Sequence, residues 1–272
     1  MRWRILAVAL LAVTAGCNAI GGSEDRTTLT PAPVPEDPPE DGPGSLLAPG
    51  VWADGRVDPG QLAKGQRAAL ENRSFRWLST QNRSGQVDNV TAGSPSHYLI
   101  VFENGTRYYR DTNQIADHRS EYVYSHLSVY ANGTHQFVRA RAFTAAGTEY
   151  TRTPVTLSAY RHIRTTTEAV EKYLSVETTT IETVTNEGRT RIRIVGEGAG
   201  PLWSDTVRDY TVRAQVTPSG IVTDLSAHYQ TVTDDSVESV DYRFTFQQLG
   251  NVTVTQPEWL PEARNRTDEY PR

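Results

Sequence analysis

Apolar and polar residues alternate along several segments of the chain. The clearest case is 240–247, where Val240, Tyr242, Phe244 and Phe246 alternate with Asp241, Arg243, Thr245 and Gln247. A period of two places alternate side chains on opposite faces of a β-strand. Segments 189–195 and 210–216 alternate in the same way. One apolar and one polar face per strand is typical of an antiparallel sheet with one face in water.

Turn signals divide these segments into hairpins. They are Asn104-Gly105, Asn132-Gly133, Asn186-Glu187-Gly188 and Pro218-Ser219-Gly220. They join strands expected at 98–102 and 107–111, 122–130 and 137–143, 176–185 and 189–195, and 210–216 and 221–230. A sheet of about nine to eleven strands must curl or split. We therefore predict an α+β fold, mainly antiparallel β, built as a curved incomplete barrel.

Two helices are expected to cover the apolar face of this sheet. Asp58-Pro59 supplies an N-cap and a proline at the first helical position, and 61–72 continues the helix. Within 158–174, apolar residues follow a helical period; they are Tyr160, Ile163, Val170, Tyr173 and Leu174. No other segment offers a cover for the sheet.

The N-terminus has the pattern of an export signal. Arg2 and Arg4 precede a short apolar run, 5–13, and small residues lead to Cys17, the one cysteine of the chain. The run is too short to span a bilayer. The segment resembles a lipobox, with Thr14 in place of the usual leucine, which predicts cleavage after residue 16 and a lipid on Cys17. The alternative is a buried free cysteine. Lipidation would anchor the protein on the outer face of the cell membrane.

Residues 17–50 have the composition of a disordered tether. Seven of the fifteen prolines lie between Pro31 and Pro49, and residues 18–50 carry a net charge of −5. Such a segment buries too little apolar surface to offset the entropy of ordering. We place the globular domain at 51–262 and a flexible tail at 263–272, and residues 51–272 together are nearly neutral.

Composition excludes several classes of function. The net charge of −5 does not provide the basic surface of a nucleic-acid-binding protein, and a single cysteine excludes an intrachain disulfide. The six histidines lack metal-binding spacing, and no nucleophile elbow or phosphate-binding loop occurs. We predict neither an enzyme nor a bound cofactor or metal.

Seven of the ten asparagines stand in Asn-x-Ser/Thr sequons, an excess that indicates a glycosylated surface. They are Asn72, Asn82, Asn89, Asn104, Asn132, Asn251 and Asn265. For Asn104 and Asn132 the following glycine offers a second explanation, because Asn-Gly is a preferred hairpin turn.

Three further groups admit both a functional and a structural interpretation. Asp234-Asp235 with Glu238 could bind a cation or form a charged hairpin tip. His126 could line a cavity or be a hydrogen-bonded sheet residue. The ladder of Arg189, Arg191 and Arg193 could hold an anionic lipid headgroup or pair with acids on the neighbouring strand.

The order of these features resembles a known group of proteins. Lipobox, acidic proline-rich linker, opening helix, long meander with a mid-chain helix, and the ending 250–259 are similar to a haloarchaeal surface lipoprotein family of unknown function. The element order is also similar to the fold of lipoprotein-carrier and mycobacterial lipoglycan-carrier proteins. That resemblance implies an incomplete barrel around an apolar cavity, with helices as its lid.

We therefore expect an exported lipoprotein that binds a lipid or other apolar ligand between sheet and helices. Aromatic residues suit the lining of such a pocket, and the candidates are Tyr122, Tyr124, Tyr210, Tyr242, Phe244 and Phe246. The alternative is a structural or interaction lipoprotein of the envelope with a packed core and no small-molecule ligand.

Overall fold

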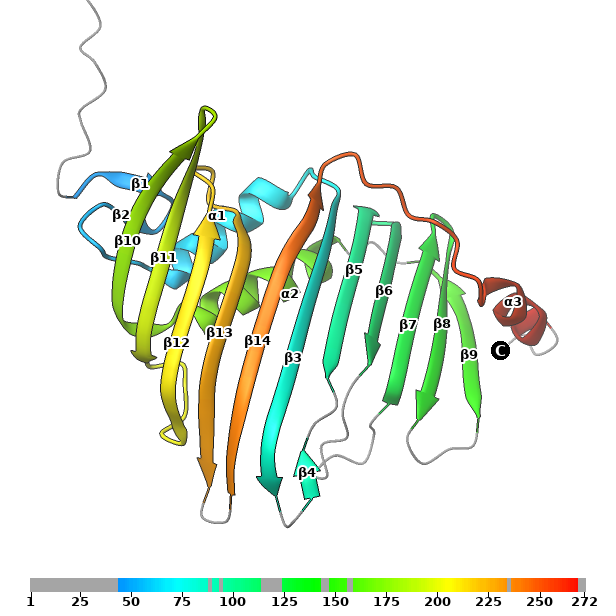
Figure 1. Cartoon of the computed structure of the whole chain (residues 1–272). Coiled ribbons are helices and arrows are strands. Elements are labelled where there is room, and N and C mark those ends of the chain that lie inside the picture. The colour runs from blue at the N-terminus through cyan, green and yellow to red at the C-terminus, as the bar shows by residue number, and fades with distance from the viewer. Residues whose placement is uncertain are drawn as a thin grey trace, which may run out of the picture. The chain divides into compact units, whose positions relative to one another are not determined.

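The computed structural model describes residues 44–87, 90–92, 95–113, 124–142, 147–155, 159–233 and 236–268. Within these ranges the chain forms one long antiparallel sheet and three helices (Figure 1). The helices are α1 (Pro59–Leu70), α2 (Ala159–Tyr173) and α3 (Leu260–Asp268). The strands of the sheet are β3 (Phe75–Val87), β4 (Val90–Ala92), β5 (Ser96–Asn104), β6 (Arg107–Asn113), β7 (Tyr124–Asn132), β8 (His135–Ala142), β9 (Thr148–Pro154), β10 (Val176–Asn186), β11 (Arg189–Ala199), β12 (Val207–Val216), β13 (Val222–Thr233) and β14 (Ser236–Leu249).

The sheet is open, with β10 and β9 as its two edge strands. Its order is β10-β11-β12-β13-β14-β3-β5-β6-β7-β8-β9, and β4 pairs with β3 beside this path. Two short strands, β1 (Leu46–Ala48) and β2 (Val51–Trp52), form a separate hairpin. The predicted mainly antiparallel, incomplete barrel is confirmed, with eleven strands along the described path. The unexpected feature is that β3 and β14, far apart in sequence, pair at its centre.

Alternation along the strands determines the two faces of the sheet. In β14 the residues with even numbers from 240 to 246 are buried, while Asp241 and Arg243 are exposed. The register aligns Phe246 with Trp77 and Trp77 with Ile100 on neighbouring strands, so their side chains lie on one face. This face is turned toward α1 and α2, and we call it the helix-facing side.

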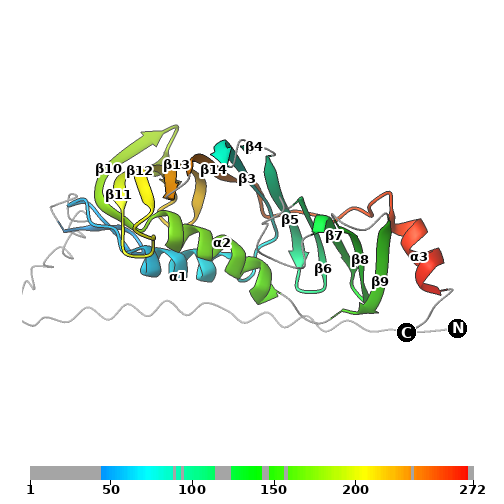
Figure 2. The same ribbon diagram turned by 90° about the horizontal axis from the view of Figure 1, so that it is seen from below.

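The predicted helices cover this side, as Figure 2 shows. The Asp58 carboxylate accepts a hydrogen bond from the Gln61 amide at 2.9 Å, which satisfies one free N–H of the first turn of α1. Both helices bury apolar side chains in the main core; they include Leu62, Leu70, Ile163 and Val170. The predicted helices at 61–72 and 158–174 therefore agree with α1 and α2 to within a few residues.

A buried glutamine joins both helices to the sheet. The side-chain amide of Gln66 donates to the Thr166 carbonyl at 3.2 Å, and its oxygen accepts from the Val222 amide at 2.9 Å. Because Gln66 is fully buried, these bonds replace those it would make with water. The contact fixes α1 against α2 and the start of β13.

Asn104 and Asn132 have the turn role that their glycine neighbours indicated. The Asn104 amide oxygen accepts from the Thr106 and Arg107 amides at 3.0 and 2.9 Å. Asn132 makes the same two contacts with Thr134 and His135. Gly133 has a φ of +105°, which glycine adopts without strain. Whether either asparagine carries a glycan stays a prediction.

Two predicted boundaries are wrong. Residues 46–50 belong to the folded part, because Ala48 is buried in the core and β1 pairs with β2. Residues 263–268 are helical rather than a flexible tail, since α3 extends to Asp268 and Ala263 is fully buried. Both boundaries were predicted from the polar composition of these segments. A few apolar side chains buried in the core are enough to order a segment that is otherwise polar.

Within the described ranges, no helix has the length and apolar character required to span a membrane.

Candidate functional site

The helix-facing side of the sheet has a filled aromatic centre. Phe244 lies 5.7 Å from Trp77 between ring centroids, and Phe246 lies 5.6 Å from Phe75. Both predicted cavity residues are thus buried among other side chains, and neither of the two pockets described below lies between them and the helices. Their contact with a ligand stays a prediction. Tyr122 and the side chain of Tyr124 lie outside the described residues.

Tyr210 and Tyr242 belong to an aromatic cluster near the C-terminal end of α2. The cluster comprises Tyr173, Trp203, Tyr210, Tyr229 and Tyr242. Tyr173 stacks on Tyr242 at 3.9 Å, and the Tyr210 hydroxyl donates to the Tyr173 carbonyl at 2.6 Å. Burial raises the pKa of Tyr173, Tyr210 and Tyr242 above the usual range, so these hydroxyls stay neutral. The cluster closes this end of the interface between α2 and the sheet.

A different environment surrounds the N-terminal end of α2. His162 is 2 % exposed and lies over β5 and β6, with its ring 4.3 Å from Tyr108 and 5.8 Å from Phe102. Neither ring nitrogen has a hydrogen-bond partner among the described residues. Burial lowers the pKa of His162 to about 4, and the charges of Arg110 and Arg161 add to the shift. His162 is therefore neutral and unpaired at pH 7.

Arg110 stands beside this histidine. It is two positions from Tyr108 on β6, so both side chains lie on the helix-facing side. Its Nε is buried without a hydrogen-bond partner, and Arg110 forms no ion pair with a carboxylate of the described chain. Trp77, in the same row of the sheet, also has a buried indole N–H without a partner. We call His162, Arg110, Tyr108 and Phe102 the His162 site.

The opposite, outer side of β5–β7 carries a hydrogen-bonded carboxylate. Asp111 accepts from the Ser128 hydroxyl at 2.7 Å, from His126 and His97 Nε2 at 2.9 and 3.0 Å, and from the Tyr109 hydroxyl at 3.0 Å. Burial alone would raise the pKa of Asp111. The hydrogen bonds from Ser128, His97 and His126 together have the opposite and larger effect, so the pKa lies below its usual value. His126 is therefore a hydrogen-bonded sheet residue rather than the lining of an interior cavity.

The Asp111 cluster is expected to stabilise the sheet. Asp111→Asn should lower the free energy of unfolding by about 1–3 kcal/mol at pH 7, because an amide NH₂ would face donors that now bond a carboxylate. The matched control is Asp241→Asn, whose exposed pairing with His228 at 2.9 Å should contribute less than about 1 kcal/mol. Urea unfolding of the two variants measures the difference. Equal losses would contradict the stabilising role of Asp111.

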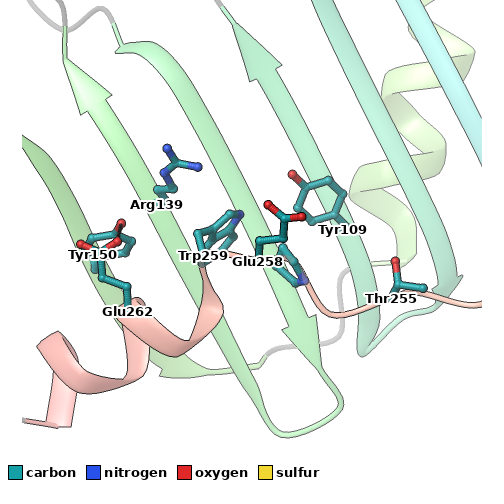
Figure 3. A pocket seen from close by; sticks show the side chains of 8 residues that line it. Tyr109, Arg139, Tyr150, Thr255, Glu258, Trp259 and Glu262 are labelled. Atoms are coloured by element: carbon teal, nitrogen blue, oxygen red, sulfur yellow. Dashed lines mark hydrogen bonds between the residues drawn. The ribbon is translucent and has the colours of Figure 1, made fainter.

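Beside this cluster, the C-terminal segment forms a cleft of about 520 Å³ with the outer side of the sheet (Figure 3). Its lining mixes aromatic rings and charges: Tyr109, Arg139, Tyr150, Thr255, Pro257, Glu258, Trp259 and Glu262. The Tyr150 hydroxyl donates to Glu262 Oε2 at 2.9 Å, which links β9 to α3. A smaller pocket of about 350 Å³ lies on β12–β14 and β3. The charged side chains in the lining of the cleft, Arg139, Glu258 and Glu262, do not suit an acyl chain.

The remaining sequence candidates are surface features. Arg193 pairs with Glu182 of the neighbouring strand at 3.1 Å, as the pairing interpretation predicts, whereas no ion pair of Arg189 or Arg191 occurs among the described residues. Glu238 pairs with Arg83, whereas Asp234 and Asp235 lie outside the described residues. In the ranges that the structure describes, no group of three metal-ligating side chains is arranged to hold an ion.

The predicted modification sites are placed in part. Cys17 and Asn89 lie outside the described residues. Four sequon asparagines besides the two in hairpin turns are exposed, and they are Asn72, Asn82, Asn251 and Asn265. Their positions are accessible to a modifying enzyme, and their occupancy stays a prediction.

No family model and no curated protein matches the chain. Among solved structures it is similar to LprF from Mycobacterium bovis, with a TM-score of 0.35 and 8 % identity over 74 % of this chain and 96 % of that chain. A LolA superfamily protein from Nitrosomonas europaea gives a TM-score of 0.22 and 7 % identity over 75 % and 97 % of the two chains. A putative outer membrane lipoprotein-sorting protein domain from Vibrio parahaemolyticus gives 0.20 and 8 % over 76 % and 97 %.

Of these three structures, the one from Nitrosomonas europaea is named as a LolA superfamily protein and the one from Vibrio parahaemolyticus as a putative lipoprotein-sorting domain. None bears on the haloarchaeal lipoprotein family. Because all three TM-scores are below 0.5, the functional argument rests on the residues of this chain.

Proposed function

We propose that the chain binds a lipid or another apolar ligand at the His162 site, between the start of α2 and strands β5 and β6. The protein is an exported lipoprotein, held on the outer face of the cell membrane through a lipid on Cys17. The composition of the acidic, proline-rich segment supports this proposal, because an extended segment of this kind would separate the folded domain from the membrane.

One observation carries the proposal. The helix-facing side is apolar, yet His162 and Arg110 each keep a buried nitrogen without a partner in the described chain. An unpaired buried polar group costs about 1–3 kcal/mol and calls for an explanation in a folded protein. A ligand that brings its own polar group into an apolar site would satisfy these nitrogens and bury its chain at the same time.

The second candidate is an envelope protein that acts through its surface. The filled contact of Trp77, Phe75 and Phe244 with α1 and α2 favours it, since these side chains are at most 1 % exposed. In that case the unpaired nitrogens would be satisfied by water.

A binding measurement separates the two candidates. The full chain would be purified without detergent, extracted with organic solvent and analysed by mass spectrometry, and the extracted protein titrated with a fluorescent dansyl fatty acid. The lipid-binding proposal predicts a co-purified lipid, or saturable binding of the probe at one site, with displacement by oleic acid. An empty protein with no saturable probe binding would contradict it and favour the surface-acting candidate.

A further inference from the structure

The charge of Arg110 is unusual for its position. Its neighbours in the same row of the sheet are Ile100 on β5 and Val129 on β7, both buried and apolar. Arginine stays protonated in proteins, so it cannot escape the cost of partial burial by losing its proton. The Nε of Arg110 is buried without a hydrogen-bond partner, and no ion pair joins its guanidinium to a carboxylate of the described residues. An anion at this place would stabilise it.

His162 offers donors to the same anion. In the neutral ring one nitrogen donates and the other accepts, and in the protonated ring both donate. Arg110 lies close enough to lower the pKa of His162, and the further charge near it, on Arg161, is also positive. Both charges that act on the pKa of His162 are therefore positive, and its ring contacts are the aromatic side chains of Tyr108 and Phe102.

We infer that Arg110 and His162 bind the acidic headgroup of the ligand, a carboxylate or phosphate, at the N-terminal end of α2, while its acyl chain packs on the apolar side chains of β5 and β6 there rather than in the filled aromatic centre. This inference rests on the proposed function and specifies its ligand class. The planar guanidinium binds two oxygens of such a group in parallel, and the imidazole donates to one of them. The apolar neighbours exclude water and so strengthen both contacts.

The test compares probes that differ only in the headgroup. Binding of oleic acid, oleyl alcohol and inorganic phosphate to the full chain is measured by calorimetry at pH 7. We expect oleic acid to bind at least about tenfold more tightly than oleyl alcohol, in line with a charge-assisted hydrogen bond. Phosphate alone should bind weakly, because it lacks the chain.

Variants at the two positions assign the effect. Arg110→Gln should weaken oleic acid binding about 10- to 100-fold and leave oleyl alcohol unchanged, whereas Arg110→Lys should keep most of the preference for the acid. Arg193→Gln removes an exposed, paired arginine and serves as the matched control. Circular dichroism and urea unfolding of each variant are the controls for correct folding.

A pH series reports on His162. An anion beside the ring favours its protonation, so binding of oleyl sulfate, which stays anionic throughout, to the wild type should strengthen about tenfold from pH 7 to pH 5. His162→Gln should lose this strengthening while it keeps the contribution of Arg110.

The outcomes separate the inference from the function on which it rests. Equal binding of acid and alcohol, unchanged in Arg110→Gln, would overturn the headgroup site and leave apolar ligand binding intact. If phosphate binds as tightly as oleic acid, the site's ligand is a free anion rather than a lipid headgroup. This result would also overturn the inference. Binding of neither oleyl probe would overturn both the function and the inference.

Discussion

Trp77→Ala is expected to lower the free energy of unfolding by about 3–5 kcal/mol, the usual effect of removing a large buried aromatic side chain. Trp77 is 1 % exposed at the centre of the sheet, 5.7 Å from Phe244 and 6.0 Å from Tyr98 between ring centroids. Its loss would leave a cavity beneath α1 and α2 that the rigid strands β3 and β14 cannot close.

Two variants control for this change. Trp77→Phe keeps much of the ring and removes the unpaired indole N–H, so we expect a loss of about 1–2 kcal/mol. Leu202→Ala removes an apolar side chain that is 57 % exposed and should change stability by less than about 0.5 kcal/mol. Urea unfolding followed by tryptophan fluorescence and circular dichroism measures all three. A loss below about 1 kcal/mol for Trp77→Ala would contradict a filled core at this position.

Stability is expected to fall as the pH is lowered from about 6.5 to about 4, because of His162. The unfolded chain takes up a proton near pH 6.5, whereas burial holds the folded-state pKa at about 4. The unfolded state therefore binds more protons within this window. The difference corresponds to a loss of about 3 kcal/mol, complete once the pH reaches the folded-state pKa.

His162→Leu isolates this effect from the other histidines. At pH 7 the ligand-free variant should be about 1–3 kcal/mol more stable than the wild type, because an apolar side chain of similar size replaces unpaired nitrogens. Between pH 7 and pH 4.5 it should lose about 2–3 kcal/mol less than the wild type. Urea unfolding at the two pH values measures both differences. Equal losses in the two proteins would show that His162 is paired or accessible to water.

The sequence contained enough information to predict the architecture but not its ends. Period-two alternation identified β12 and β14, and Asp58-Pro59 identified the start of α1, because these signals act within a few residues. By contrast, β3 was not predicted, because its middle is a run of polar residues from Ser79 to Ser84 in which no apolar–polar alternation can be recognised. The helix α3 holds only two buried apolar residues, Leu260 and Ala263, too few for a helical stripe.

The candidate site could not be predicted because its members are distant in sequence. Arg110 and His162 are 52 positions apart, and neither has a local motif. They come near each other because β6 pairs with β5, and His162 of α2 packs on Phe102 and Tyr108 of these two strands. The one available signal was Arg110, which alternation places on the same face of its strand as Tyr108, and alternation alone could not identify the residues around it. The Asp111 cluster was missed for the same reason, since its donors come from three strands.

The most direct test of ligand binding at the His162 site is photocrosslinking. The full chain is irradiated with a fatty acid that carries a diazirine near its carboxyl group, and the labelled peptides are identified by mass spectrometry. Binding at this site predicts saturable labelling within 105–113 and 159–166, prevented by excess oleic acid. Labelling confined to the C-terminal cleft at 255–262, or labelling that oleic acid does not prevent, would contradict it.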